Sequence, residues 1–102
     1  MSETNGHPGL RLEGEVTIYN AIEIKLRLLE TLARAANPEV DLSAVTELDT
    51  AGLQLLLLGK QEAARLGKTL RYLNHSPAVV EILDFCNLIG RFGDPVVLVS
   101  NP

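Results

Sequence analysis

The stretch from residue 40 to residue 74 constrains the fold most, because two short apolar segments flank one long amphipathic segment. Val40-Asp41-Leu42 and residues 70–74 are typical of strands, while residues 51–66 have helical periodicity and end at Gly67. Two strands joined in this way form a βαβ unit with parallel strands and a right-handed crossover. The sequence therefore predicts an α/β protein with a largely parallel sheet.

The segment before this unit predicts one strand and one helix. Residues 10–18 alternate between apolar and polar side chains around Gly14, which indicates one bent strand or two short ones with a turn or bulge. Asn20 and Glu23 have the spacing of a capping box, and Asn37-Pro38 ends the helix that they open. The predicted core face of this helix consists of Ala21, Ile24, Leu28, Leu32 and Ala35.

The segments on either side of the second helix complete the expected order. We expect a loop of about five residues after Leu42, before the helix begins. Ser76 as N-cap and Pro77 at the first helical position open a third helix that runs to about Leu88. Residues 96–99 then predict a last strand, so the expected order is β-β-α-β-α-β-α-β.

Composition narrows the classes of function. With 102 residues the chain is one domain, and a net charge of −4 without a basic stripe argues against binding to nucleic acid or to an anionic membrane surface. Residues 1–9 are polar and predict a flexible arm, with the domain spanning 10–102. Absence of an export signal and a single cysteine, Cys86, point to a cytoplasmic protein, and Cys86 itself is expected to pack in the core of the third helix.

No catalytic or metal-binding constellation accompanies the acidic residues. His7 and His75 have no second ligand at suitable spacing, and Asp41 and Asp49 have neither a nucleophile nor a phosphate loop beside them. We therefore expect a protein without cofactor or metal that is not an enzyme. Glu13 and Glu15 are expected to lie on the solvent-exposed face of the first strand.

The candidate site is the segment that joins residue 42 to the second helix. In open α/β sheets, functional crevices lie beyond the carboxyl ends of the strands, beside helix N-termini. Thr50 stands at such a helix start, where its hydroxyl could be an ordinary helix cap; Asp49 could equally be the cap and leave Thr50 facing outward. Ala51 and Gly52 are small enough to let another molecule approach the backbone.

Leu58 is a second candidate contact for a partner. On a helical wheel it falls within the polar arc that contains Gln54, Gln61 and Arg65. An exposed leucine near the candidate site could contact a partner, although single surface leucines are also common without any function. The residues expected to bind a partner are Asp49, Ala51, Gly52, Gln54, Leu58 and Ser43.

Three motifs resemble those of the STAS family, named for sulfate transporters and anti-sigma factor antagonists. Leu12-Glu13-Gly14-Glu15-Val16 is similar to the Gly-Glu motif of the first strand. Residues 41–53, DLSAVTELDTAGL, are similar to the signature D-x-S-x-V-x-x-[MLIV]-D-[ST]-[SA]-G-L. Ser76-Pro77-Ala78-Val79 resembles the start of the third helix in anti-sigma factor antagonists. The resemblance implies a single STAS domain whose mixed sheet has four or five strands, with three helices packed against it.

The resemblance also implies a function. The family's phosphorylated Ser or Thr corresponds to Thr50. The implied protein is a bacterial signalling module that regulates transcription by partner switching. It binds an anti-sigma factor, a serine/threonine kinase of the GHKL type, is released by phosphorylation and is reset by a phosphatase. It is expected to be a monomer or weak dimer.

Two alternatives stay open beside this interpretation. Some similar single-domain proteins accompany chemotaxis systems, and small STAS subunits of ABC lipid-transport systems carry a similar Asp-Thr-Ala-Gly stretch. Ser76-Pro77-Ala78-Val79 favours the antagonist branch. Nucleotide binding has no glycine-rich phosphate loop to support it, and sulfate transport has no membrane span.

Overall fold

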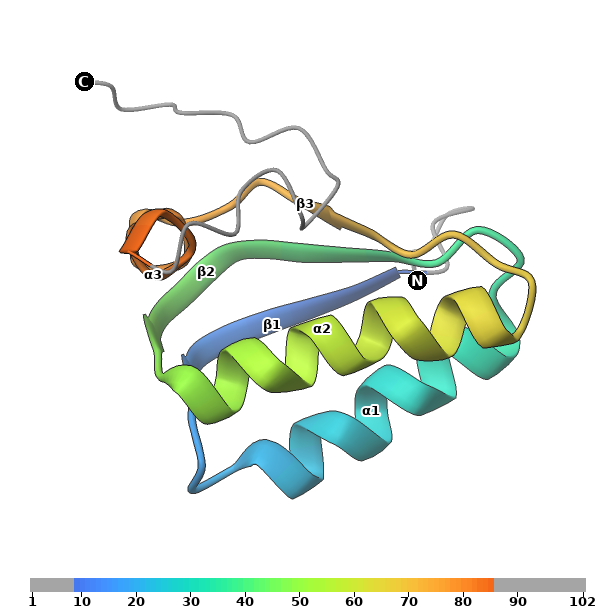
Figure 1. Cartoon of the computed structure of the whole chain (residues 1–102), viewed down its shortest axis with the longest axis horizontal. Helices are drawn as coiled ribbons and strands as arrows, with labels where there is room; N and C mark the ends of the chain where they lie inside the picture. The colour runs from blue at the N-terminus through green and yellow to red at the C-terminus, as the bar shows by residue number, and fades with distance from the viewer. Residues whose placement is uncertain (1–8, 86–102) are drawn as a thin grey trace, which may run out of the picture.

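The computed structural model describes residues 9–85, which alternate between strands and helices (Figure 1). The elements are β1 (Gly9–Val16), α1 (Ala21–Arg34), β2 (Glu39–Leu48), α2 (Thr50–Arg65), β3 (Arg71–Leu73) and α3 (Pro77–Phe85). The predicted α/β class is confirmed. The arm predicted for residues 1–9 lies outside the described residues except for Gly9, which begins β1. The last strand at 96–99, Cys86 and the end of the third helix also lie outside them.

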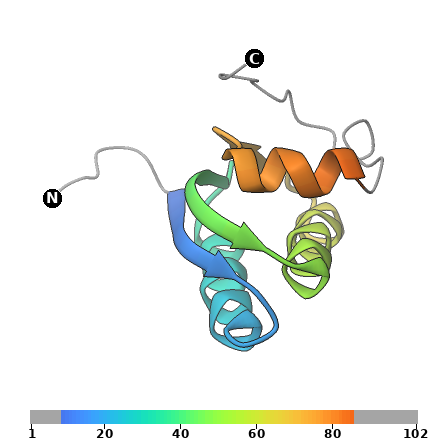
Figure 2. The same ribbon diagram turned by 90° about the vertical axis from the view of Figure 1, so that its left-hand side faces the viewer.

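The three strands form one sheet in the order β1-β2-β3, and both pairings are parallel. The predicted βαβ unit is present as β2, α2 and β3, with Val40 opposite Tyr72. Helices α1 and α2 lie side by side on one face of the sheet, whereas α3 lies on the other face beside β2 (Figures 1 and 2). The described part of the chain therefore has three layers, and its sheet holds three of the four or five strands expected.

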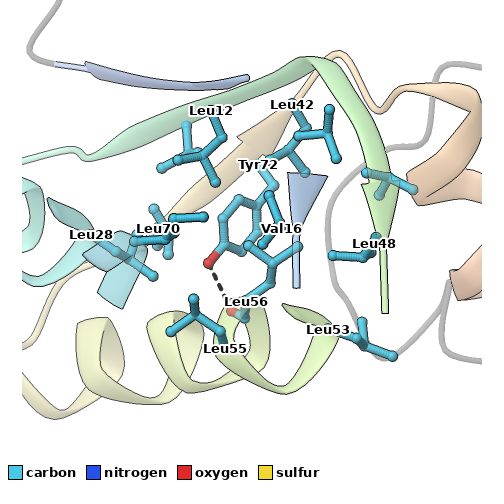
Figure 3. Close-up of a cluster of buried hydrophobic side chains, with 14 of the residues drawn as sticks. Leu12, Val16, Leu28, Leu42, Leu48, Leu53, Leu55, Leu56, Leu70 and Tyr72 are labelled. Atoms are coloured by element: carbon cyan, nitrogen blue, oxygen red, sulfur yellow. Dashed lines mark hydrogen bonds between the residues drawn. The ribbon is translucent and has the colours of Figure 1, made fainter. Parts of the chain in front are cut away.

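The core lies between the sheet and the two helices α1 and α2. Leu12, Val16 and Leu42 are fully buried and point towards these helices (Figure 3). Tyr72 is also fully buried, and its hydroxyl donates a hydrogen bond of 2.7 Å to the Leu56 carbonyl. Burial of each large apolar side chain contributes about 1.5–3 kcal/mol, so this layer supplies most of the stabilisation.

The irregularity predicted at Gly14 is present. Gly14 has a φ of +76°, a conformation that glycine adopts without steric cost. The register between β1 and β2 shifts between Arg11 and Glu13 and again between Gly14 and Glu15. At each shift the extra residue lies in β2, so β2 is the strand that bulges and bends, while Leu12 and Val16 of β1 still point into the core.

Strand β2 is longer than predicted, because the loop expected after Leu42 is strand as far as Leu48. The buried apolar residues that follow are Val45 and Leu48, spaced by three rather than two. The register shifts opposite them explain this spacing, since each bulge adds a residue and returns the next apolar side chain to the same face.

The capping box predicted for the first helix is wrong. Asn20 precedes α1, but its side chain makes no cap hydrogen bond. Instead its Oδ1 accepts from the Thr17 amide at 2.9 Å and its Nδ2 donates to the Glu15 carbonyl at 2.8 Å. Asn20 therefore holds the turn between β1 and α1. The predicted core face is confirmed, with Ile24, Leu28 and Leu32 buried.

The predicted end of the second helix and the predicted start of the third are confirmed. Gly67 has a φ of +74° and follows α2 as the C′ residue. Its amide donates to the Ala64 carbonyl, and the Lys68 amide donates to the Ala63 carbonyl at 2.8 Å, which is a Schellman motif. Ser76 caps α3, since its Oγ accepts from the Val79 amide at 3.3 Å.

Candidate functional site

The site lies where β1 and β2 end and α2 begins. Parallel pairing brings Val16 opposite Leu48 at one edge of the sheet. The Asp49 amide donates to the Val16 carbonyl at 3.4 Å, which ties the start of α2 to the end of β1. The turn that leads from β1 into α1 is therefore a neighbour of the first turn of α2.

Asp49 is the N-cap of α2 and also holds the neighbouring turn. Its Oδ1 accepts from the Gly52 amide at 2.8 Å, and its Oδ2 accepts from the Ile18 amide at 3.0 Å. These hydrogen bonds, that from Gly52 above all, lower the pKa of Asp49 below its ordinary value, so the carboxylate is charged at neutral pH. One side chain thus joins two loops that lie 31 residues apart in the sequence.

Thr50 is the first residue of α2 and is exposed. Since Asp49 supplies the cap, the alternative in which Thr50 is the helix cap is wrong. No hydrogen bond joins the Thr50 hydroxyl to another residue of the described range 9–85. The hydroxyl is therefore not engaged in holding the fold and lies on the surface at a helix N-terminus.

Gly52 is buried, and the group that approaches it closely belongs to this chain. A Cβ at Gly52 would lie 2.0 Å from the Val16 carbonyl oxygen and 2.7 Å from Cδ1 of Leu48. Only glycine lets the first turn of α2 sit against the end of the sheet. The structure thus gives Gly52 a packing role, and its direct contact with a partner stays a prediction.

The other predicted contact residues do not all gather at this site. Gln54 is exposed and Ala51 half-buried in the first turns of α2. Ser43 is exposed but lies five residues before Leu48 in β2, roughly 16 Å along the strand. Leu58 is half-buried and packs against the core, so the prediction that it is exposed is wrong. It falls within the polar arc of a wheel, yet it packs at the margin of the core.

Asp41 is a second carboxylate that the sequence singled out, and it lies within β2. Its Oδ1 accepts from the Ser43 amide at 2.8 Å. Partial burial works against ionisation, yet the hydrogen bonds from Ser43 prevail and lower the pKa of Asp41. Asp41 therefore stabilises a bulge of the sheet.

An apolar group that the sequence patterns did not single out lies beside the site. Ile18 is 66% exposed, Tyr19 92% and Ile22 77%, and all three lie in the turn before α1 or in its first turn. The alternation of residues 10–18 predicted a strand as far as Ile18, whereas β1 ends at Val16. The sequence did contain an indication of this exposed group, because Ile22 and Leu26 fall outside the predicted core face of the helix.

Two further properties of the described residues bear on chemistry. Within residues 9–85, no three His, Cys, Asp or Glu residues are placed to hold a metal ion. No helix among the same residues is long and apolar enough to cross a membrane.

The fold and the site together define a class. The chain belongs to the STAS domain family: the family model described as "Mlab, STAS domain" matches residues 1–98. Among solved structures, the anti-sigma factor antagonist SpoIIAA in its unphosphorylated form matches with a TM-score of 0.61 and 18% sequence identity, over 81% of this chain and 79% of that chain. At this identity the likeness concerns the fold alone. A search of curated proteins found no match.

Proposed function

We propose that this chain is a non-enzymatic regulatory module of the anti-sigma factor antagonist type, which binds a protein partner through the start of α2 and is switched by phosphorylation of Thr50. The observation that carries the proposal is that two adjacent residues have different structural roles. Asp49 caps the helix with its carboxylate, whereas Thr50 is exposed and does not cap the helix. A kinase could modify Thr50 without breaking a hydrogen bond of the fold.

The physics of a phosphate at this position supports a switch. A phosphate adds about −1.5 to −2 charges at neutral pH, beside an Asp49 that is already ionised. The N-terminus of a helix tolerates this charge, so the domain should stay folded. A closely packed interface does not, because burying an unpaired dianion costs on the order of several kcal/mol. Binding should therefore be lost while the fold persists.

The partner proposed is an anti-sigma factor of the GHKL kinase type, with a phosphatase that resets the module in the cytoplasm. Ser76-Pro77-Ala78-Val79, which resembles the stretch that opens the third helix in anti-sigma factor antagonists, stands at the start of α3 and supports this branch. Neither a cofactor nor a metal takes part in this proposal.

A second candidate is an accessory subunit of an ABC lipid-transport system. The name Mlab in the matching family model favours it. The stretch Asp49-Thr50-Ala51-Gly52 also resembles the one found in such subunits. A third candidate is a regulator associated with chemotaxis that uses the same switch.

Affinity purification from the native cell tests the proposal and separates the candidates. The bait is the tagged full chain, as wild type and as Thr50→Ala, Thr50→Glu and Thr69→Glu variants. Thr69 is exposed in the loop after α2, about 24 Å from Thr50, and controls for added charge. We expect a GHKL-type kinase with all baits except Thr50→Glu, and a phosphopeptide containing Thr50.

Recovery of an ABC ATPase instead would select the second candidate. Equal retention of the same partner by Thr50→Glu and Thr50→Ala would refute the switch.

A further inference from the structure

Helix α1 carries a second apolar stripe on the side away from its core face. With Ile24 at 0° on a helical wheel, the buried residues fall at roughly 0–80° and the second stripe at roughly 140–200°. Its outer members are Ile22 and Leu26, which are 77% and 63% exposed. Ala33 is exposed as well, and Leu29 is half-buried at the margin of the core.

The spacing of this stripe is that of a helix–helix seam. Tyr19, Ile22, Leu26, Leu29 and Ala33 are separated by three, four, three and four residues, which is the a/d pattern of a heptad. Tyr19, in the turn before the helix, is 92% exposed at the first of these positions. Such a pattern is typical of a helix that packs against another helix.

The residues that flank the stripe fit a second copy of the same helix. In this register Glu23 and Glu30 occupy e positions, and Lys25 occupies the g position. In a parallel pair each g residue faces the e residue that lies five positions further on in the other helix. Lys25 of each copy would therefore face Glu30 of the other copy, which gives two equivalent ion pairs. In an antiparallel pair the e positions face each other, which would bring together Glu23 and Glu30, two like charges.

The position of α2 leads to the same orientation. Glu62 of α2 has a lowered pKa, chiefly because of its hydrogen bond with Arg65 and, in addition, because of the charge of Lys25. On the same side of α1, Cδ2 of Leu28 lies 2.8 Å from the position that a Cβ would take at Gly59 of α2, so the g side of α1 faces α2 and the rest of the domain. An antiparallel pair would place both domains on one side of the seam, whereas a parallel pair places them on opposite sides.

We propose that the second stripe of α1 forms the interface of a parallel, two-fold symmetric dimer of this chain. The exposed members Tyr19, Ile22 and Leu26 present on the order of 500 Å², as much as the largest apolar patch of a typical monomer. This is less than the roughly 800 Å² per partner of a standard interface, so the dimer is weak and depends on concentration. Helices α1 and α2 both begin at the same edge of the sheet (Figure 1). In a parallel dimer, the Thr50 residues of the two copies therefore lie at the same end of the dimer.

Sedimentation equilibrium of the full chain, from about 10 μM to about 1 mM, tests the proposal without any partner or phosphate. The mean mass should rise with concentration from 11.1 kDa towards twice that value. Leu26→Glu should weaken association at least about tenfold. Phe85→Glu should leave it unchanged, although Phe85 of α3 is 85% exposed, because it lies outside the seam. Circular dichroism confirms that each variant is folded.

Charge exchange tests the parallel register itself. Lys25→Glu and Glu30→Lys should each weaken the dimer roughly threefold to tenfold, and the double variant should return to within about twofold of the wild type. A chain that stays at 11.1 kDa up to about 1 mM overturns the proposal, as does equal weakening by Leu26→Glu and Phe85→Glu. A stronger dimer with Glu30→Lys alone indicates the antiparallel pair and overturns the register. Since Thr50 is unchanged throughout, none of these outcomes bears on the phosphorylation switch.

Discussion

Replacement of Gly52 by alanine tests how the site is built. Alanine is a better helix former than glycine by about 1 kcal/mol, so at an unhindered helical position the change would stabilise the protein. At Gly52 the new Cβ would lie 2.0 Å from the Val16 carbonyl oxygen, whereas carbon and oxygen atoms normally stay at least roughly 3.3 Å apart. The structure therefore predicts the opposite sign.

The size of the effect follows from what must move. The neighbouring atoms of Val16 belong to the backbone of β1, which is paired there with Leu48 of β2, so the first turn of α2 has to shift by about 1 Å. Overpacking of this kind costs about 1–3 kcal/mol. The shift also strains the hydrogen bonds of Asp49 with Val16 and Ile18, each worth about 1 kcal/mol. We expect Gly52→Ala to lower the free energy of unfolding by about 3–5 kcal/mol.

Urea denaturation followed by circular dichroism measures this loss, and thermal denaturation should show a Tm at least about 12 °C lower. Gly67→Ala is the matched control. Gly67 has a φ of +74°, and no atom lies within 4 Å of the position that a Cβ would take, so only backbone strain of about 1–2 kcal/mol applies. The reasoning is refuted if Gly52→Ala destabilises the protein no more than Gly67→Ala.

Three further outcomes are expected. Asp49→Ala removes the cap of α2 and the tie to Ile18 and should cost about 1–2 kcal/mol in urea denaturation, whereas Thr50→Ala should change the free energy of unfolding by less than about 0.5 kcal/mol; similar losses for the two would contradict the assignment of the cap. Because the pKa of Asp49 is lower in the folded than in the unfolded state, the stabilisation that its carboxylate provides is present above about pH 4 and is lost as the pH falls through the folded-state value. The free energy of unfolding of Asp49→Asn, measured as a function of pH, should lack this loss. An acid dependence equal to that of the wild type would contradict the assignment. Tyr72→Phe removes the buried hydrogen bond to the Leu56 carbonyl and should cost about 1–2 kcal/mol, with a neutral result arguing against that bond.

The sequence predicted those features that depend on local chemistry. The helix from Thr50 to Arg65 follows from its periodicity and from Gly67, and the cap of α3 follows from Ser76-Pro77. The parallel pairing of β2 with β3 follows from the general handedness and geometry of βαβ units. The signals for the helix and its caps lie within a few residues of the features that they predict, and the βαβ unit is one continuous stretch of the chain.

Features that depend on distant residues were missed. The end of β2 was mistaken for a loop because its apolar spacing is set by bulges opposite β1. Asn20 was assigned to a capping box, yet its side chain bonds to the turn that precedes the helix. Nothing in the sequence indicates that the second carboxylate oxygen of Asp49 holds the Ile18 amide.

The exposure of single residues was the least predictable part of the site. Asp49 and Thr50 were equal candidates for the cap, and only the extended backbone of Asp49 with its bond to Gly52 decides between them. Leu58 is half-buried although its wheel position is polar. Conversely, Ile22 and Leu26 are exposed, because α1 has apolar residues on two sides and only one can face the sheet.

Calorimetric titration of the captured protein partner with unmodified and with Thr50-phosphorylated chain tests the central claim most directly. We predict that the phosphate weakens binding at least about 30-fold, while the free energy of unfolding of the isolated domain changes by less than about 1 kcal/mol. Equal affinities for the two forms would contradict the account. So would a phosphorylated domain that loses its fold, because Thr50 would then be part of the architecture and not a switch on its surface.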